Sequence, residues 1–176
     1  MEGDGRREID HAKDKRKARL IFKANSLVDR RLIELLYEAS QAGVKIDLVI
    51  RGICSLVPGV KDVSENIRVI SILGRYLEHS RIFYFHNNGK EEIYLGSADL
   101  MPRNLNHRVE VVFPVERVEH IRYLRDHVLE AYLNDNISAR IMHSDGTYKR
   151  VHPASKEKGR EVQSLLMEKP SGVILR

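Results

Sequence analysis

A strand, a helix and a second strand follow one another with short joints near the start of the chain, and this succession most constrains the fold. Residues 18–23 are mostly apolar and predict a strand. Residues 44–51 alternate before becoming continuously apolar, which is typical of a buried strand. Between them, Asp29 can cap a helix over residues 30–42 that ends at Gly43. A helical crossover joins parallel strands, so the sequence predicts a βαβ unit.

The rest of the chain predicts strands and helices that extend this unit into one sheet. Strands are expected over residues 66–72, 81–85, 91–96 and 108–113, a hairpin-type turn at 87–90, a long amphipathic helix over 115–133, a hairpin over 137–151 and a helix near 155–168. We therefore expect an α/β fold with a mixed β-sheet flanked by α-helices in a single domain. Residues 1–17 are expected to form a helical or linker segment before a domain over residues 18–176.

The composition suits a folded domain with a polyanionic partner. The chain has 176 residues, the length of one domain, and 42% of them are hydrophobic, which supports a core rather than disorder. A formal net charge of +5 favours nucleic acid, a phosphorylated nucleotide or a phosphate polymer as the partner. The chain has no Trp and few aromatic residues, which argues against a protein that stacks single-stranded nucleic acid.

The sequence also favours a cytoplasmic protein. Its single cysteine, Cys54, can form no internal disulfide, as expected in a reducing compartment. No apolar stretch reaches the length of a membrane span, so we expect no transmembrane segment. The first seven residues are charged and lack the apolar centre of a signal peptide.

Two candidate functional residues lie beside expected strands. Arg51 follows the second strand of the βαβ unit, and ligands of open α/β sheets collect beyond the carboxyl ends of strands. The adjacent Gly52 allows close backbone approach, so Arg51 can bind an anion, although an arginine at a strand end can also simply reach solvent. His79 lies between two strands beside Arg81 and could donate a proton or contact a phosphate, although many loop histidines have no such role.

A polar loop over residues 96–110 is the third candidate site. It is entered and left by apolar strands and gathers hydroxyl, carboxylate, amide, guanidinium and imidazole side chains, as loops that carry sites often do. Ser97, Asp99 and Asn104 belong to it, and all three residue types are equally suited to capping a long turn. The composition of the loop alone leaves both interpretations open.

Two of these segments together resemble the phospholipase D superfamily pattern. The superfamily has His-x-Lys followed by Gly-Ser-x-Asn, and this chain has His79-Ser80-Arg81 followed by Gly96-Ser97-Ala98-Asp99 and Asn104. Enzymes of this superfamily use the histidine on phosphoryl groups. Two residues depart from the pattern: Arg81 replaces the lysine, and His86 stands where an aspartate would fall.

Longer stretches resemble bacterial polyphosphate kinase, in the order of that family and over roughly residues 7–150. They are Asn25-Ser26-Leu27-Val28-Asp29, Glu38 to Leu48, Arg51-Gly52-Ile53-Cys54, Pro58-Gly59-Val60, Ser64 to Val69, Gly74 to Ile82, and Ser97-Ala98-Asp99-x-Met101-x-Arg103-Asn104. The resemblance is to the C-terminal, second phospholipase-D-like catalytic domain of the family. It therefore implies a phospholipase-D-like sheet for residues 18–176.

The resemblance also implies roles for individual residues. Arg51 and Arg108 match residues that contact nucleotide phosphates, and His79 matches a catalytic-site histidine that contacts phosphate and can donate a proton to it. Supporting roles are implied for Ser97, Asp99, Asn104 and Arg81. These roles suit phosphoryl transfer, which asks the protein mainly for positioning and positive charge. Glu78 could raise the affinity of the adjacent imidazole for a proton.

Enzymes of this family transfer the γ-phosphate of ATP reversibly to inorganic polyphosphate. The resemblance implies ATP or ADP and polyphosphate as ligands, and a homo-oligomeric, cytoplasmic enzyme that can associate with membranes through its full-length form. The family's phosphorylated histidine lies on the preceding catalytic domain, and the ligands of its Mg²⁺ lie mostly outside the domain that this chain resembles. No metal ligands and no nucleic-acid partner are expected here, and the chain by itself is expected to be inactive.

Two alternatives remain open on the sequence. The chain can be a non-catalytic module that binds nucleotide or polyphosphate, or that serves assembly. It can also be a phospholipase-D-like phosphodiesterase or nuclease, although Arg81 and His86 count against this because the superfamily uses lysine and aspartate there.

Overall fold

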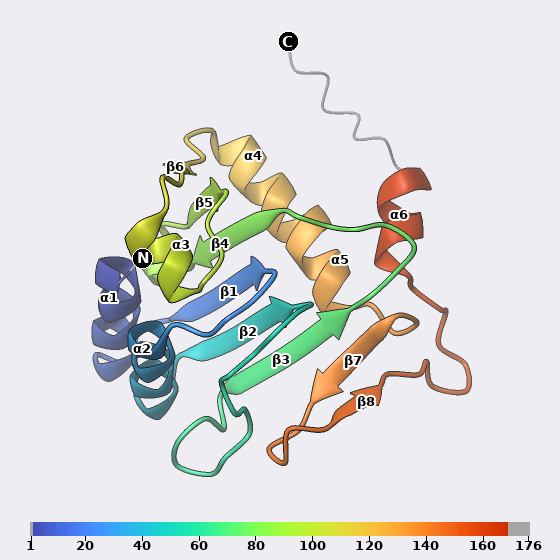
Figure 1. Ribbon diagram of the computed structural model, residues 1–176, viewed down its shortest axis with the longest axis horizontal. Helices are drawn as coiled ribbons and strands as arrows, with labels where there is room; N and C mark the ends of the chain where they lie inside the picture. The colour runs from blue at the N-terminus through green and yellow to red at the C-terminus, as the bar shows by residue number, and fades with distance from the viewer. Residues whose placement is uncertain (1, 169–176) are drawn as a thin grey trace.

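The computed structural model describes residues 2–168, which form one mixed eight-stranded sheet with helices on both faces (Figure 1). The strands are β1 (Arg19–Ala24), β2 (Lys45–Ile50), β3 (Ile67–Ile72), β4 (Arg81–Phe85), β5 (Glu92–Gly96), β6 (Val112–Pro114), β7 (Ala139–Met142) and β8 (Tyr148–Arg150). The helices are α1 (Glu2–Lys13), α2 (Arg30–Gln41), α3 (Pro102–His107), α4 (Val118–Tyr123), α5 (Glu130–Leu133) and α6 (Val162–Glu168). The expected α/β fold is confirmed.

The βαβ unit forms the centre of the sheet as the sequence predicts. β1 and β2 run parallel with Arg19 opposite Lys45, and β3 continues the parallel set beside β2. The Asp29 side chain caps α2 by accepting a hydrogen bond from the backbone N–H of Leu32 at 3.0 Å. Outside this unit the sheet is antiparallel, and its order is β6-β5-β4-β1-β2-β3-β7-β8.

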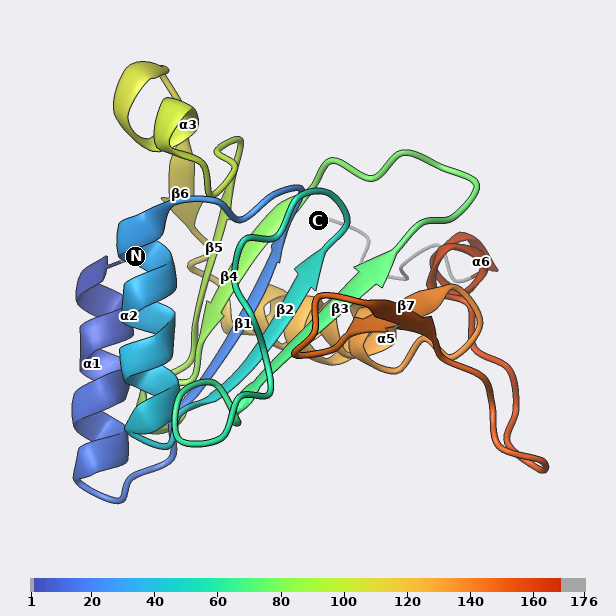
Figure 2. The same cartoon turned by 60° about the horizontal axis from the view of Figure 1, so that its bottom comes forward.

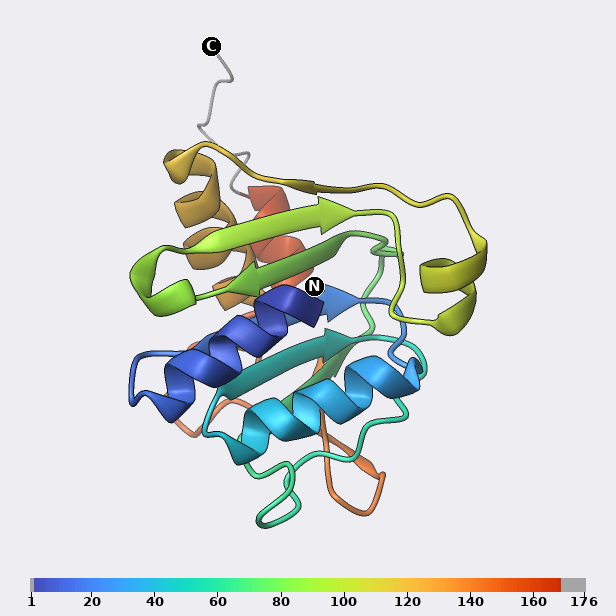
Figure 3. The ribbon, with the colours of Figure 1, turned by 90° about the vertical axis from the view of Figure 1, so that its left-hand side faces the viewer.

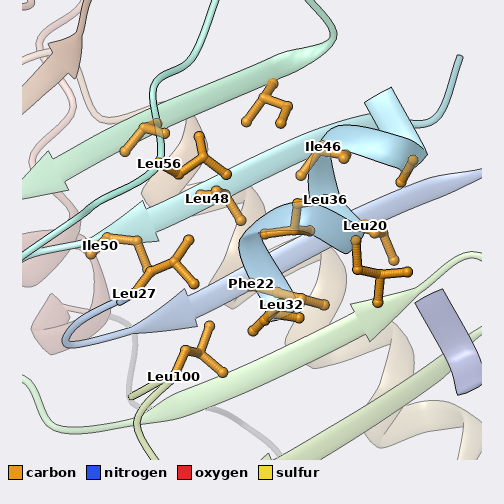
Figure 4. Packing of buried hydrophobic residues seen from close by; sticks show 14 of the residues in the cluster. Leu20, Phe22, Leu27, Leu32, Leu36, Ile46, Leu48, Ile50, Leu56 and Leu100 are labelled. Atoms are coloured by element: carbon orange, nitrogen blue, oxygen red, sulfur yellow. The ribbon is translucent and has the colours of Figure 1, made fainter. Parts of the chain in front are cut away.

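Alternating side chains of the strands build two apolar layers, one on each face of the sheet. Helices α1 and α2 lie side by side on one face, and α4 and α5 cover the other (Figures 2 and 3). Leu20 and Phe22 of β1 pack towards α2 together with Leu48 of β2 (Figure 4). Ile21 belongs to the opposite layer, which includes Tyr132 of α5. This alternation also decides on which face each polar side chain of the strands emerges.

Helix α1 is tied to the rest of the domain by a buried carboxylate. Glu8 is fully buried and accepts hydrogen bonds from the backbone N–H of Arg19, at 3.1 Å, and from that of Asn87. Ile9 of the same helix belongs to the apolar layer beneath α2. The domain boundary expected after residue 17 stays a prediction.

Several elements differ from the expectations, among them α6, which begins at Val162 and not near residue 155. Residues 102–107 of the expected polar loop form helix α3, because Pro102 stands at its first turn, where the missing N–H costs nothing. The strand expected over residues 108–113 shrinks to Val112–Pro114, since only this part pairs with β5. The expected hairpin turn is a 3₁₀ turn, η1, over Asn87–Gly89.

The long helix expected over residues 115–133 is present but interrupted. Helices α4 and α5 are joined by a π-helical turn, η2 (Leu124–Leu129), so the segment is helical from residue 118 to 133. Such a turn adds one residue to the helix and often occurs at functional sites. It precedes Tyr132, which reaches the candidate site. None of the helices within residues 2–168 combines the length and the apolar composition that crossing a membrane requires.

Candidate functional site

The candidate site lies at one edge of the sheet, where β1 and β2 end and β4 begins. The three elements meet there because β2 is parallel to β1 and β4 is antiparallel to it. Leu27 holds the loops together by donating to Ile53 O at 2.8 Å and forming bridges with Cys54 and Leu100. Gly52 allows the closest approach: its N–H donates to Asn25 O at 2.7 Å, and a Cβ there would lie 2.8 Å from that oxygen.

Arg51 enters this edge from the end of β2 and is held by Asn25. Its Nε donates to Asn25 Oδ1 at 2.7 Å, and Asn25 in turn donates from its backbone N to Asp99 Oδ1 at 2.9 Å. Across residues 2–168, no hydrogen bond engages the two terminal nitrogens of Arg51. The guanidinium is therefore oriented by one nitrogen while its fork stays available for an anion.

Arg81 and Asp99 form a buried ion pair that Asn25 links to Arg51. Arg81 is 5% exposed, and its Nη2 and Nε donate to the two Asp99 oxygens at 2.9 and 3.3 Å. Burial raises the pKa of Asp99, but the hydrogen bonds from Arg81 and Asn25 outweigh it and hold that pKa below its usual value. The guanidinium of Arg81 therefore has a structural role in the site.

His79 is exposed beside this pair. Arg81 Nη1 lies 2.6 Å from His79 Nδ1 and donates to the His79 backbone oxygen, also at 2.6 Å, while Nη2 lies 3.1 Å from Nε2. The guanidinium therefore fixes both the backbone and the ring of His79. His86, which replaces the aspartate of the phospholipase D pattern, lies at the other end of β4 and caps η1.

Within residues 2–168, Glu78 forms its hydrogen bonds and ion pair with residues other than His79. Glu78 Oε1 accepts from Gln163 at 2.8 Å, and Oε2 accepts from the hydroxyl of Tyr132 and lies 3.2 Å from Lys23 Nζ. The carboxylate turns towards the face covered by α5, whereas the imidazole of His79 turns towards Arg81. The effect of Glu78 on the adjacent imidazole stays a prediction.

Lys23 is a residue of the site that the sequence analysis missed. It is 5% exposed, and its Nζ donates to Ser80 Oγ at 2.9 Å and lies 4.7 Å from the centre of the Tyr132 ring. Burial lowers its pKa, Glu78 opposes this, and the charges of Arg51 and Arg81 lower it further. These three cations therefore share one region of the sheet edge. A signal existed, because Lys23 and Arg51 are the last residues of the strands that the sequence predicts over residues 18–23 and 44–51.

A second group of side chains surrounds Glu110 next to this region. Asn104 Nδ2 donates to Glu110 Oε1 at 2.7 Å, and the Ser97 hydroxyl donates to Oε2. These hydrogen bonds lower the pKa of Glu110, although burial opposes them, and the charges of Arg108 and Arg81 lower it further. Arg108 is exposed at the end of α3, two residues before Glu110.

A small hollow lies beside Arg51 at this edge of the sheet. A pocket of about 150 Å³ lies between Arg51 and residues 72–78. Ligand pockets are usually larger than roughly 300 Å³, and a second pocket of about 200 Å³ adjoins this one at residues 74–76. Within residues 2–168, no three His, Cys, Asp or Glu side chains converge as metal ligands would.

Comparisons with known proteins agree with this geometry. Residues 5–163 match the family model described as polyphosphate kinase C-terminal domain 2. A polyphosphate kinase of Prosthecochloris aestuarii is 56% identical over 145 residues, which cover 82% of this chain and 20% of that protein. The chain therefore spans about a fifth of the length of this relative.

Solved structures give the same fold. The crystal structure of polyphosphate kinase from Porphyromonas gingivalis matches with a TM-score of 0.90 and 43% identity, over 94% of this chain and 25% of that one. Nuc from Salmonella typhimurium, a phospholipase D family member, matches with a TM-score of 0.56 and 16% identity, over 77% of this chain and 89% of that one. The expected phospholipase-D-like fold is thus confirmed.

Proposed function

The chain belongs to the polyphosphate kinase family, and from this premise we propose that it is the C-terminal part of an enzyme that transfers the γ-phosphate of ATP reversibly to inorganic polyphosphate. In this proposal the chain contributes contacts to nucleotide and polyphosphate phosphates and one catalytic-site histidine. The remainder of the enzyme supplies the histidine that becomes phosphorylated.

The observation that carries the proposal is the cluster of cations at one sheet edge. Lys23, Arg51 and Arg81 lie close enough for the two arginines to lower the pKa of the buried lysine, which burial lowers most. Arg81 is paired with Asp99 and Lys23 with Glu78, whereas the fork of Arg51 has no partner within residues 2–168 and attracts an anion. A phosphate chain is such an anion, and phosphoryl transfer is promoted mainly by fixed positive charge around the moving group.

Different residues of the cluster have different roles in the proposal. Arg51 uses its free fork to bind a nucleotide phosphate, and Arg108 binds a second phosphate from the end of α3. His79 contacts the transferred phosphate and can donate a proton to it. Asp99, Asn104, Ser97 and Arg81 hold these groups in place, because their side chains already bond one another or Glu110.

We propose that Mg²⁺ reaches the site with the phosphates of ATP or ADP. The carboxylates near the site do not fit a protein-held ion: Asp99 accepts from Arg81 and Asn25, and Glu110 accepts from Ser97 and Asn104. A bound Mg²⁺ would neutralise phosphate charge during transfer. Its protein ligands belong to the rest of the enzyme in this proposal.

The rest of the nucleotide site comes from the preceding catalytic domain. The pocket beside Arg51 is smaller than most ligand pockets, which supports a further surface for base and ribose on that domain. We propose that the complete enzyme is a cytoplasmic homo-oligomer. The lone, half-buried Cys54 suits a reducing compartment. Binding of phosphate without catalysis is the second candidate function for the chain by itself, favoured by the same small pocket.

Arg51→Ala in the complete enzyme tests the proposal. Losing one charge-assisted phosphate contact raises the KM for ATP by about ten- to a hundredfold. Arg51→Lys recovers part of the loss, because a point charge cannot replace the fork. Arg31→Ala, an exposed arginine on α2, is the matched control and leaves the KM unchanged. Steady-state kinetics of polyphosphate synthesis measure all three, and an Arg51→Ala enzyme with unchanged KM and kcat would overturn the proposal.

A further inference from the structure

Lys23 is a buried charge that holds both neighbours of His79. Its ammonium donates to Ser80 Oγ at 2.9 Å and to Ser80 O at 3.4 Å, and forms an ion pair with Glu78 Oε2 at 3.2 Å. An ammonium has three donors, and these three acceptors use them all. Lys23 therefore acts on the site through residues 78 and 80, and not by offering its own protons to a ligand.

Residues 78–80 are held by side chains from both faces of the sheet. In β1, Lys23 shares the face of Ile21, which belongs to the layer beneath α5. In β4, Arg81 shares the face of Phe83, which belongs to the layer beneath α2. Lys23 lies opposite Ile82 in the β1–β4 register, next to Arg81. Two cations on opposite faces thus fix the three residues that precede β4.

Glu78 connects this segment to two helices by hydrogen bonds. Its oxygens accept from Tyr132 of α5 and from Gln163 of α6, and Gln163 also exchanges hydrogen bonds with the backbone of Tyr76 at 2.9 Å in each direction. The loop before His79 is therefore pinned at residues 76, 78 and 80. Because His79 itself is exposed, these contacts, together with Arg81, determine where its ring stands.

A buried lysine at this position is costly for packing alone. Burial disfavours the ammonium, and the nearby charges of Arg51 and Arg81 disfavour it further. An aliphatic side chain such as Met would fill the same space against Tyr132 without either cost. Packing therefore does not explain why residue 23 is charged. Its two polar partners, Glu78 and Ser80, lie on either side of His79 in the chain.

We propose that Lys23 is a positioning residue that fixes the segment of residues 78–80 and thereby presents His79 to the phosphate being transferred. The inference rests on the proposed function for its catalytic consequence. Its structural part, the immobilisation of residues 76–81 by Lys23, stands independently of any reaction.

Hydrogen exchange on the 176-residue chain tests the structural part with Lys23→Met, Lys23→Arg and Ser80→Ala. In Lys23→Met, amides of residues 76–81 exchange at least about tenfold faster, because local opening becomes easier, while amides of β1 and β2 keep their wild-type rates. Lys23→Arg retains most of the protection, and Ser80→Ala loses part of it. Lys45→Met, at the exposed start of β2, is the matched control and changes nothing in residues 76–81.

Kinetics of the complete enzyme test the catalytic part. Lys23→Met lowers kcat by about ten- to a hundredfold, as a misplaced catalytic group does, while the KM for ATP changes less than about threefold, because Arg51 is intact. Ser80→Ala lowers kcat by less, and Lys23→Arg restores most of it. A purely structural lysine would instead lower the melting temperature and leave kcat per folded enzyme unchanged.

The results separate the two proposals. Unchanged exchange of residues 76–81 in Lys23→Met, or unchanged kcat with full-length enzyme, overturns the role of Lys23. If Lys23→Met does not fold, Ser80→Ala decides, and wild-type exchange and kcat in that variant overturn the role equally. A wild-type enzyme without polyphosphate kinase activity would overturn the proposed function alone, because the exchange measurement needs no substrate.

Discussion

At the scale of single residues, the ion pair between Arg81 and Asp99 determines how the site is built. Both side chains are almost fully buried, and each also contacts a further site residue: Arg81 contacts His79, and Asp99 contacts Asn25. Removing one member of a buried pair leaves the other charge without compensation. The pair therefore links the stability of the domain to the geometry of the site.

Asp99→Asn should lower the free energy of unfolding by roughly 3 kcal/mol near neutral pH. The pKa of Asp99 is depressed in the folded protein, so its contribution is present above its unfolded pKa of about 4 and is lost as pH falls through the folded value. Urea unfolding between pH 7 and 3 should show a shallower acid decline for Asp99→Asn than for wild type. Glu34→Gln, in an exposed pair with Arg30, is the control and changes stability by less than about 1 kcal/mol. Parallel pH curves for wild type and Asp99→Asn would contradict the depressed pKa.

His79→Ala should separate catalysis from folding. An exposed histidine that donates a proton contributes about a hundredfold or more to kcat, but little to stability. We expect the turnover of the complete enzyme to fall by that factor, with a melting temperature within about 2 °C of wild type. His152→Ala, another exposed histidine, should change neither quantity. A stable and fully active His79→Ala enzyme would rule out His79 as a catalytic residue.

The sequence analysis found Arg51 and His79 but not Lys23, and the reason is physical. Arg51 stands out because it follows a continuously apolar strand. Lys23 lies in a strand that also carries a charged residue, Arg19, so its charge did not set it apart. Its burial depends on Glu78 and Tyr132, which lie 55 and more residues away in the chain. The carboxyl-end rule applied to β1 as well as to β2 would have identified Lys23.

At the scale of elements, the βαβ unit was predicted well because its signals are local. Hydrophobic periodicity and the Asp29 cap defined α2 within one or two residues of its observed ends. Helix α3 was missed because it is short, and its residues are equally typical of a polar loop. The extent of β6 could not be read from periodicity, because it depends on where the chain pairs with β5.

Asp29→Ala should destabilise the domain through α2. The Asp29 carboxylate accepts the hydrogen bond from Leu32 N, and losing an N-cap of this kind costs about 1 kcal/mol. Arg31→Ala, on the exposed side of the same helix, is the control and should stay within about 0.5 kcal/mol of wild type. Chemical denaturation followed by circular dichroism measures both. Equal stabilities of the two variants would mean that the cap contributes nothing to the domain.

At the scale of the whole molecule, the fold assembles its cations at one edge of the sheet and leaves the site shallow. Arg51, Lys23 and Arg81 come from three neighbouring strands or their ends, and Arg108 comes from α3. The hollow beside Arg51 is about 150 Å³. Such a site can attract a phosphate group by its positive charge, but it surrounds little of a nucleotide base. The architecture therefore suits one half of a nucleotide site.

The 176-residue chain by itself should consequently bind ADP and pyrophosphate with similar, weak affinity. If only the phosphates are held, the base and ribose of ADP add nothing, and two or three exposed charge-assisted contacts correspond to a dissociation constant on the order of 1 mM. Calorimetry at low salt with ADP, pyrophosphate and adenosine measures this, with Arg51→Ala as the variant that weakens both phosphate ligands. Adenosine should not bind.

The same chain should neither make polyphosphate nor retain label from γ-labelled ATP with magnesium. In the proposed function the histidine that becomes phosphorylated lies in the remainder of the enzyme, so His79 has the role of a proton donor and not that of the nucleophile. Acid-labile label that persists on wild type and disappears in His79→Ala would make His79 the nucleophile and overturn its assignment as a proton donor. If the site is divided between this chain and the preceding catalytic domain, the chain should bind ADP without becoming labelled. Adding the preceding catalytic domain should then restore polyphosphate synthesis.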